Sequence, residues 1–287
     1  MANHLDKDIK NLSLDMPFPP GKAPFSIAGE WILKEPFKIL GDIPAGKESS
    51  VTLPTLLDGR QPLEDAVIRA TLRSADGTEW VAQDSLWLLP APRATKPPEV
   101  DGKLEEWEGR SAAWMFYDYA WAPLGRSMCQ LDEGAEQFGY LPYTVDARAA
   151  IWASWDPENL YLAIRLDDDQ PVLDIEKGES LRILIKPQGK ESLQAELRPS
   201  ADGKGSAILQ GTSSPKKNLK MRSVNTKNAT RIEVAIPWTD LGTSAKQGEL
   251  LGFDFYWTDV DRNGDKLVSG TMRWAGASKT SGYLLLK

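Results

Sequence analysis

Apolar residues that recur with a period of two constrain this chain more than any other feature of its sequence. Between residues 159 and 168, the aliphatic side chains of Leu160, Leu162, Ile164 and Leu166 alternate with other residue types. The same alternation recurs at residues 231–236 and 251–257, and about ten strand-like runs fill residues 147–287. Strands of this type bury one face each. We therefore predict an all-β fold in which this region is a two-sheet antiparallel β-sandwich.

Residues 25–90 also contain only strand-like runs, which Gly and Pro residues separate. The Asp76-Gly77 pair is typical of a hairpin turn, because both positions tolerate a positive φ. Short strands at close spacing, without a helical run, predict a small immunoglobulin-like sandwich over residues 25–90. The four prolines of residues 1–24 predict an extended lead-in before it.

Four prolines occur within the nine residues 90–98. Proline cannot donate to a sheet ladder and favours a stiff, extended chain. We therefore predict a Pro-rich linker over residues 91–98, with the second and larger domain over residues 99–287. Two domains also agree with a length of 287 residues.

The composition excludes several classes of function. The net charge is −7 without a basic block, so we expect no nucleic-acid and no membrane partner. His4 is the only histidine and Cys129 the only cysteine, which removes Ser-His-Asp and Cys-His catalysis and thiolate or imidazole zinc sites. We expect no organic cofactor.

The N-terminal residues bear on where the protein is located. Residues 1–15 contain no apolar run of the kind that a signal peptide needs. Two settings stay open: the protein is cytoplasmic, or the sequence comes from an exported parent whose signal peptide has been removed. In that case we expect an extracellular or periplasmic protein.

Aromatic residues are the main candidates for binding, since the chain has 11 Trp against 7 Tyr and 7 Phe. Residues 111–146 interrupt the strand pattern and form an aromatic insertion. Flat aromatic rings stack on the apolar faces of sugars. The candidate sugar-binding residues in the insertion are Trp114, Tyr117, Tyr119, Trp121, Tyr140 and Tyr143. The alternative is that these rings pack the insertion onto the sandwich or onto the first domain.

Trp152 is a further candidate outside the insertion. In its strand it points away from Ile151 and Ala153, and therefore lies on the other face of the sheet. Trp107, Trp155 and Trp238 are predicted to belong to the core instead.

A series of short motifs runs from about residue 98 to the C-terminus. It opens with VDGKLEEW at residues 100–107, and WDPENLYL follows at residues 155–162. Further members stand in order at residues 179–185, 233–238, 251–255, 273–274 and 282–286. The series resembles the family 9 carbohydrate-binding modules. This resemblance implies a β-sandwich that binds a polysaccharide or oligosaccharide beside a catalytic domain of a larger, glycan-degrading parent protein.

The sequence departs from that family at the sugar site. Family members hold the sugar between two tryptophans, but the corresponding residues 174–179 and 275–281 contain none. The family's carboxylate falls on Arg182, and an arginine of the next strand corresponds to Arg198. The resemblance thus implies Arg182 and Arg198 as sugar-binding residues, with the insertion supplying the aromatic platform.

The candidate metal ligands are Asp259, Asp261, Asn263 and Asp265, in the pattern D-x-D-x-N-G-D. Oxygen ligands at alternate positions with a glycine for the turn suit structural Ca²⁺, which the resemblance also implies. Position twelve of such a loop holds Gly270 instead of glutamate, so the alternative is a polar hairpin turn at Asn263-Gly264. The acidic run Asp167–Asp169 is another candidate cation site.

Three functions remain open, with non-catalytic glycan binding favoured as part of a glycan-degrading system. The alternative is a structural or protein-interaction module without sugar binding. A carboxylate-dependent glycosidase or lyase is less favoured, because no pair of acids stands out whose environments would separate their pKa values.

Overall fold

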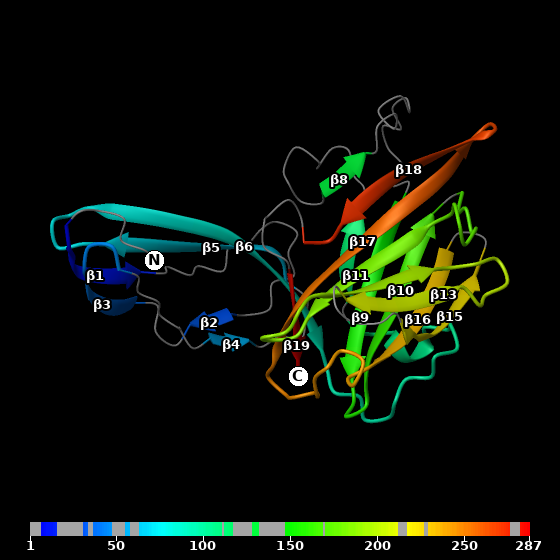
Figure 1. The fold of residues 1–287 in the computed structure, drawn as a ribbon, viewed down its shortest axis with the longest axis horizontal. Helices are drawn as coiled ribbons and strands as arrows, with labels where there is room; N and C mark the ends of the chain where they lie inside the picture. Colours follow the sequence, from blue (N-terminus) through cyan, green and yellow to red (C-terminus); the bar gives the residue numbers. More distant parts are fainter. Residues whose placement is uncertain are drawn as a thin grey trace. The chain divides into compact units, whose positions relative to one another are not determined.

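A computed structural model describes residues 7–15, 31–33, 37–47, 55–57, 63–110, 112–116, 128–131, 147–168, 170–211, 217–226, 229–275 and 282–287 (Figure 1). The chain divides into two compact units, Met1–Leu86 and Trp87–Lys287. The predicted all-β fold is confirmed: the described residues form mainly antiparallel sheets, and their only helix is the 3-10 turn η1 (Glu105–Trp107). Among them, no helix has the length and apolarity to cross a membrane.

In the first unit, β1 (Ile9–Asp15) pairs antiparallel with both β3 (Phe37–Ile43) and β5 (Leu63–Arg73). β2 (Trp31–Leu33) pairs with β4 (Thr55–Leu57). Strand structure thus begins inside the predicted lead-in of residues 1–24. The immunoglobulin-like topology of this unit stays a prediction.

The hairpin turn predicted at Asp76-Gly77 lies between β5 and β6 (Glu79–Ala91). Gly77 has φ +83°, and the Ser74 N–H donates to the carbonyl oxygen of Thr78 over 3.0 Å. A small core of Ile9, Leu12 and Ile43 is buried in this unit.

The second unit contains a five-stranded antiparallel sheet, here called the small sheet. Its order is β15 (Lys220–Asn225), β16 (Ala229–Pro237), β10 (Asn159–Asp168), β9 (Ala147–Trp155) and β7 (Ala113–Phe116). The alternation that predicted β10 is observed, because Leu160, Leu162, Ile164 and Leu166 lie in one core cluster and Tyr161 and Ala163 in another. β10 pairs with β9 on one side and with β16 on the other.

The large sheet of this unit lies opposite the small sheet. Its path runs through β14 (Lys217–Asn218), β13 (Ser206–Gly211), β12 (Leu193–Arg198), β11 (Ser180–Lys186), β17 (Leu250–Asn263), β19 (Gly282–Leu286) and the end of β6. β18 (Lys266–Arg273) pairs with β17 and with β8 (Met128–Leu131). β19 pairs with β6 in parallel, whereas the other registers of this sheet are antiparallel.

One continuous core fills the space between the two sheets. The small sheet contributes residues such as Ile164 and Val234, and the large sheet contributes Ile183, Phe255 and Trp257, all fully buried. Side chains from two facing sheets in one core define a β-sandwich. The predicted sandwich is therefore present in this unit.

The outer face of the small sheet is covered by the VDGKLEEW segment. Val100, Leu104 and Trp107 pack there against Tyr161 and Ala163. Trp107, Trp155 and Trp238 are all buried, as predicted.

Residues 91–94 of the predicted linker pair within the second unit. The carbonyl oxygen of Ala91 accepts a hydrogen bond from the Lys287 N–H over 2.8 Å, and that of Pro92 accepts one from Trp155 over 3.2 Å. Arg93 and Ala94 donate in return. Proline lacks only the donor, so its carbonyl and its neighbours still bond to strand ends. The units accordingly separate at Leu86/Trp87, before the prolines.

Candidate functional site

A row of polar side chains crosses the outer face of the large sheet. Arg182 on β11 stands opposite Glu196 on β12 and opposite Tyr256 on β17, and Tyr256 stands opposite Arg273 on β18. Because cross-strand neighbours lie about 5 Å apart, these four side chains form one band across four strands. We call it the polar row.

Most charges in and near the polar row are paired. The guanidinium of Arg198 bonds to the Glu196 carboxylate over 2.7 Å and donates to the Ile175 carbonyl oxygen over 3.2 Å. Arg273 pairs with the fully buried Asp254 over 2.6 Å. Burial raises the pKa of Asp254, and the Arg273 charge opposes that rise. Both carboxylates of this region are thus engaged by arginines.

Arg182 differs from these two arginines. Its guanidinium carbon lies 5.2 Å from the centre of the Tyr256 ring, and that of Arg273 lies 5.3 Å from the same ring. Its side chain is exposed, and within the described ranges no ion pair involves it. A cation held over an aromatic ring keeps its N–H donors in a defined orientation, available to a ligand.

An open hollow of about 230 Å³ lies beside the row. Its lining comes from the loop before β11 and from the outer faces of β11, β12, β17 and β18. The residues are Glu176, Lys177, Gly178, Ser180, Arg198, Thr258, Val260, Leu267 and Ser269. The structure thus brings Arg182 and Arg198 to one face, on adjacent strands, with Arg198 in the wall of a hollow.

The aromatic candidates cannot be assigned to this face. Tyr117, Tyr119, Trp121, Tyr140 and Tyr143 lie outside the described residues. Trp114 is a position on β7 opposite Ala150.

Trp152 points away from Ile151 and Ala153, as predicted. It packs on the cluster around Trp107, and its indole N–H donates to the Arg110 carbonyl oxygen over 3.1 Å. It belongs to the small sheet, so Trp152 and the polar row lie on opposite faces of the sandwich and form no common site.

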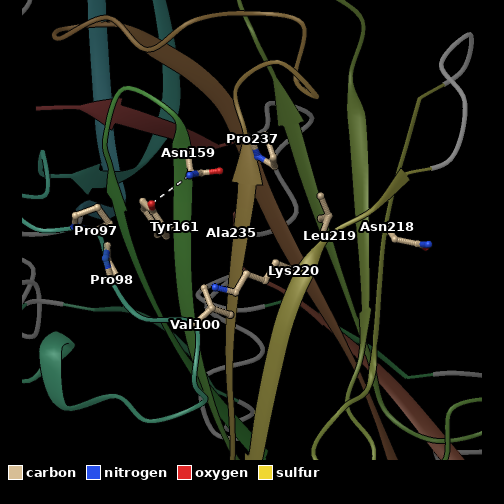
Figure 2. A pocket seen from close by; sticks show the side chains of 10 residues that line it. All are labelled: Pro97, Pro98, Val100, Asn159, Tyr161, Asn218, Leu219, Lys220, Ala235 and Pro237. Carbon is tan, nitrogen blue, oxygen red and sulfur yellow. Dashed lines mark hydrogen bonds between the residues drawn. The ribbon is translucent and has the colours of Figure 1, made fainter.

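A second hollow, of about 260 Å³, lies on the outer face of the small sheet (Figure 2). The Tyr161 hydroxyl donates to Asp156 over 2.7 Å and accepts from the Asn159 amide over 3.2 Å. Burial, with the Asp156 hydrogen bond, raises the pKa of Tyr161 to about 12. Tyr161, Asp156 and Asn159 therefore hydrogen-bond to one another at this hollow.

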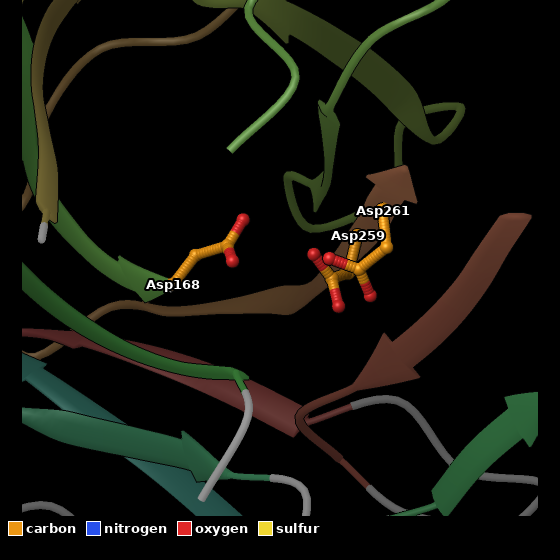
Figure 3. Close-up of side chains that lie close together, drawn as sticks. All are labelled: Asp168, Asp259 and Asp261. Carbon is orange, nitrogen blue, oxygen red and sulfur yellow. The ribbon is translucent and has the colours of Figure 1, made fainter. Parts of the chain in front are cut away.

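The predicted metal ligands do not lie together in the structure. Strand β17 continues to Asn263, so Asp259 and Asp261 point into the sandwich and approach Asp168 (Figure 3). One carboxylate oxygen from each of the three lies within 4.8 Å of the others. Asp265 is exposed at the hairpin turn, where Gly264 has φ +61°. The D-x-D-x-N-G-D residues therefore form the end of a strand and a tight turn, and calcium binding by them stays a prediction.

The sequence interpretation missed Glu179 and Tyr256. Glu179 is buried beside Asp168, and Tyr256 stands between two arginines. The alternation in this strand could have revealed Tyr256, because it puts Tyr256 on the face of the sheet that Phe255 does not share. Nothing local marks Glu179, because an acid at the start of a strand is ordinarily solvated.

Comparisons with known proteins give matches in structure alone. No family model matches the chain, and no curated protein matches it. A carbohydrate-binding module family 9 from Caldicellulosiruptor kristjanssonii in complex with cellotriose aligns over 70% of this chain and 93% of its own, with 14% identity and a TM-score of 0.43. A module of the same family and organism in complex with glucose aligns over 69% of this chain and 95% of its own, with 14% identity and a TM-score of 0.38. A protein from Bacteroides uniformis aligns over 70% of this chain and 99% of its own, with 12% identity and a TM-score of 0.42. The chain is similar in structure to these proteins.

Proposed function

We propose that the outer face of the large sheet binds a glycan without catalysis. The observation that carries this proposal is the meeting of Arg182 and Arg198, which the motif resemblance implies as sugar-binding residues, on one face beside a hollow. The motifs alone left open whether two arginines on different strands share a site.

The chemistry of the hollow suits a sugar ring. The Arg198 guanidinium and the hydroxyls of Ser180 and Thr258 can bond to sugar hydroxyls, while Val260 and Leu267 offer apolar contact to a CH face. The exposed cation of Arg182, together with exposed Lys186 on the same face of β11, favours a glycan that carries carboxylates.

The carboxylates support binding over hydrolysis. Glycosidases need two carboxyl groups free to act as acid and as base or nucleophile. Near the polar row, Glu196 is engaged by Arg198 and Asp254 by Arg273. We propose that the chain acts as an accessory to a catalytic partner in glycan degradation, in an extracellular or periplasmic setting.

The test is a glycan array with neutral and uronate-containing oligosaccharides, followed by calorimetry on the hits. Arg182→Ala and Arg198→Ala should each weaken binding about 10- to 100-fold, as expected for a charged hydrogen bond worth about 1.5–3 kcal/mol. Arg222→Ala, which removes an exposed arginine of β15 on the small sheet, should leave the affinity unchanged.

Two results would contradict the proposal. A glycan that both arginine variants bind as tightly as the unmodified protein would place the site elsewhere. An array without any reproducible hit would favour the alternative, a structural or protein-interaction module.

A further inference from the structure

Three arginines and one acid stand together on the outer face of the small sheet, on the opposite side of the sandwich from the polar row. Arg165 of β10 and Arg231 of β16 are direct cross-strand partners. Arg148 of β9 stands opposite Asp167 of β10. The residues next to these four in sequence are buried, so the strand alternation turns the four side chains to the outer face. We call them the arginine cluster.

The arginine cluster carries an excess of positive charge. Asp167 accepts hydrogen bonds from Nε of Arg148 over 2.5 Å and from Nε of Arg165 over 2.6 Å. Arg231 forms no ion pair among the residues that the structure describes. Three guanidinium groups against one carboxylate leave two positive charges on this face, in a chain whose net charge is −7.

The next acid on the same face of β16 does not neutralise Arg231. The carboxylate of Glu233 accepts hydrogen bonds from Trp107 Nε1 and from the N–H groups of Asp101 and Gly102. Burial raises the pKa of Glu233 to about 7, so it carries only part of a negative charge at neutral pH. Arg231 is therefore left without an anionic partner.

The position of Arg165 opposite Arg231 is unfavourable without an anion. Like charges at directly opposed positions of an antiparallel pair are destabilising, and their Cβ atoms lie about 4.5–5.5 Å apart. The Arg165 side chain is 42% exposed, and Arg231 is half-buried, so a ligand can reach both. An anion between the two guanidinium groups removes their repulsion and accepts hydrogen bonds from both.

We propose that Arg165 and Arg231 together bind one tetrahedral ester oxyanion, a sulfate or phosphate group carried by a sugar. A guanidinium group presents paired N–H donors that match two oxygens of an oxyanion. An ester of this kind has three terminal oxygens, so two can bond to one guanidinium and the third to the other. A carboxylate cannot make both contacts without sharing an oxygen.

This site is separate from the one on the outer face of the large sheet. Only the attachment of the ester to a sugar rests on the proposed glycan function, and the oxyanion site itself does not. The net charge of −7 favours a ligand with isolated ester groups, because the rest of the surface repels a dense run of negative charge.

The test follows the arginine Nε–Hε signals of the whole chain by NMR, at constant ionic strength. Titration with glucose 6-sulfate or glucose 6-phosphate should shift the signals of Arg165 and Arg231 until they saturate. Glucose should leave both signals unchanged, and glucuronate should bind more weakly than the better ester. The ester that binds more tightly identifies which of the two groups the site prefers.

Variants separate this site from general attraction between charges. Arg165→Ala and Arg231→Ala should each weaken the affinity for the better ester about 10-fold or more, since each removes charged hydrogen bonds. Asp167→Asn should tighten binding, because it removes the acid that competes for Arg165. Arg222→Ala is the matched control. It removes the same charge from the same face, but Arg222 stands opposite Glu233, so the affinity should change less than about 2-fold.

A stability measurement separates lost binding from lost folding. Without ligand, Arg231→Ala should unfold at a urea concentration at or above that of the unmodified protein, because it removes one of two opposed like charges.

The proposal is overturned if neither ester gives a saturable shift, or if glucuronate binds as tightly as the better ester. It is also overturned if Arg222→Ala weakens binding as much as Arg231→Ala, because binding would then depend on overall charge alone. None of these results touches the site at Arg182 and Arg198. Conversely, a glycan array without hits leaves this titration unaffected.

Discussion

At the residue scale, Glu233 anchors the VDGKLEEW segment to the small sheet. Its carboxylate accepts hydrogen bonds from Trp107 Nε1 over 2.7 Å, the Gly102 N–H over 2.8 Å and the Asp101 N–H over 3.0 Å. Burial raises the pKa of Glu233 to about 7, although these three donors act in the opposite direction.

The raised pKa predicts a pH-dependent stability. Because the folded state holds this proton more tightly than the unfolded state, the stabilisation is complete below about pH 4.5 and is lost as the pH rises through 7. The urea midpoint of the unmodified protein should therefore fall between pH 5 and pH 8 more steeply than that of Glu233→Gln. Parallel profiles for the two proteins would show that Glu233 does not titrate in this range.

The sequence shows part of this arrangement. Ile232 and Val234 of β16 point into the core, so the alternation puts Glu233 between them on the outer face of the sheet. It does not show that this face is covered, since the donors come from residues 101–107, more than 120 positions away. Contacts of such sequence separation leave no local pattern.

At the element scale, β17 shows how two patterns compete within one segment. The local pattern D-x-D-x-N-G-D favours a metal loop, whereas the alternation of Phe253, Phe255 and Trp257 continues through Asp259 and Asp261. The strand is observed, because its ladder with β18 runs to Asn263. The strand alternation therefore predicted this segment better, and it puts both half-buried acids on the face of β17 that carries Trp257.

The VDGKLEEW segment gives a second prediction at this scale. Gly102 has φ +84°, and a Cβ there would lie 2.7 Å from Val224 Cγ2 and 3.2 Å from backbone atoms of β15. Gly248 has φ +83° with open space around it. Gly248→Ala should cost about 1–2 kcal/mol for the left-handed backbone alone.

Gly102→Ala should cost more than Gly248→Ala, because it also forces the segment off the sheet. Urea unfolding of both variants measures the difference. Equal losses would mean that the segment can shift freely to admit a methyl group.

At the scale of the whole molecule, the sequence predicted two domains and the structure divides the chain into two units, but the predicted boundary differs. The prolines of residues 90–98 indicated a spacer, since proline interrupts sheets. Pro90 lies instead within β6, and the carbonyl oxygen of Pro92 accepts from the Trp155 N–H. A prediction that considers only the missing N–H of proline does not reveal this pairing.

The position of Trp87 yields the last prediction, which concerns where the second unit begins. Residues 88–91 pair in parallel with β19, and Trp87 and Leu89 belong to the sandwich core. The Trp87 and Trp274 rings lie 5.7 Å apart, edge to face. A fragment of residues 87–287 should therefore unfold cooperatively in urea.

A fragment of residues 99–287 loses a large aromatic and a leucine from the core, each worth about 2–5 kcal/mol, which approaches the stability of a whole domain. It should lose its near-ultraviolet circular dichroism, and equal urea midpoints for the two fragments would restore the boundary to the proline segment.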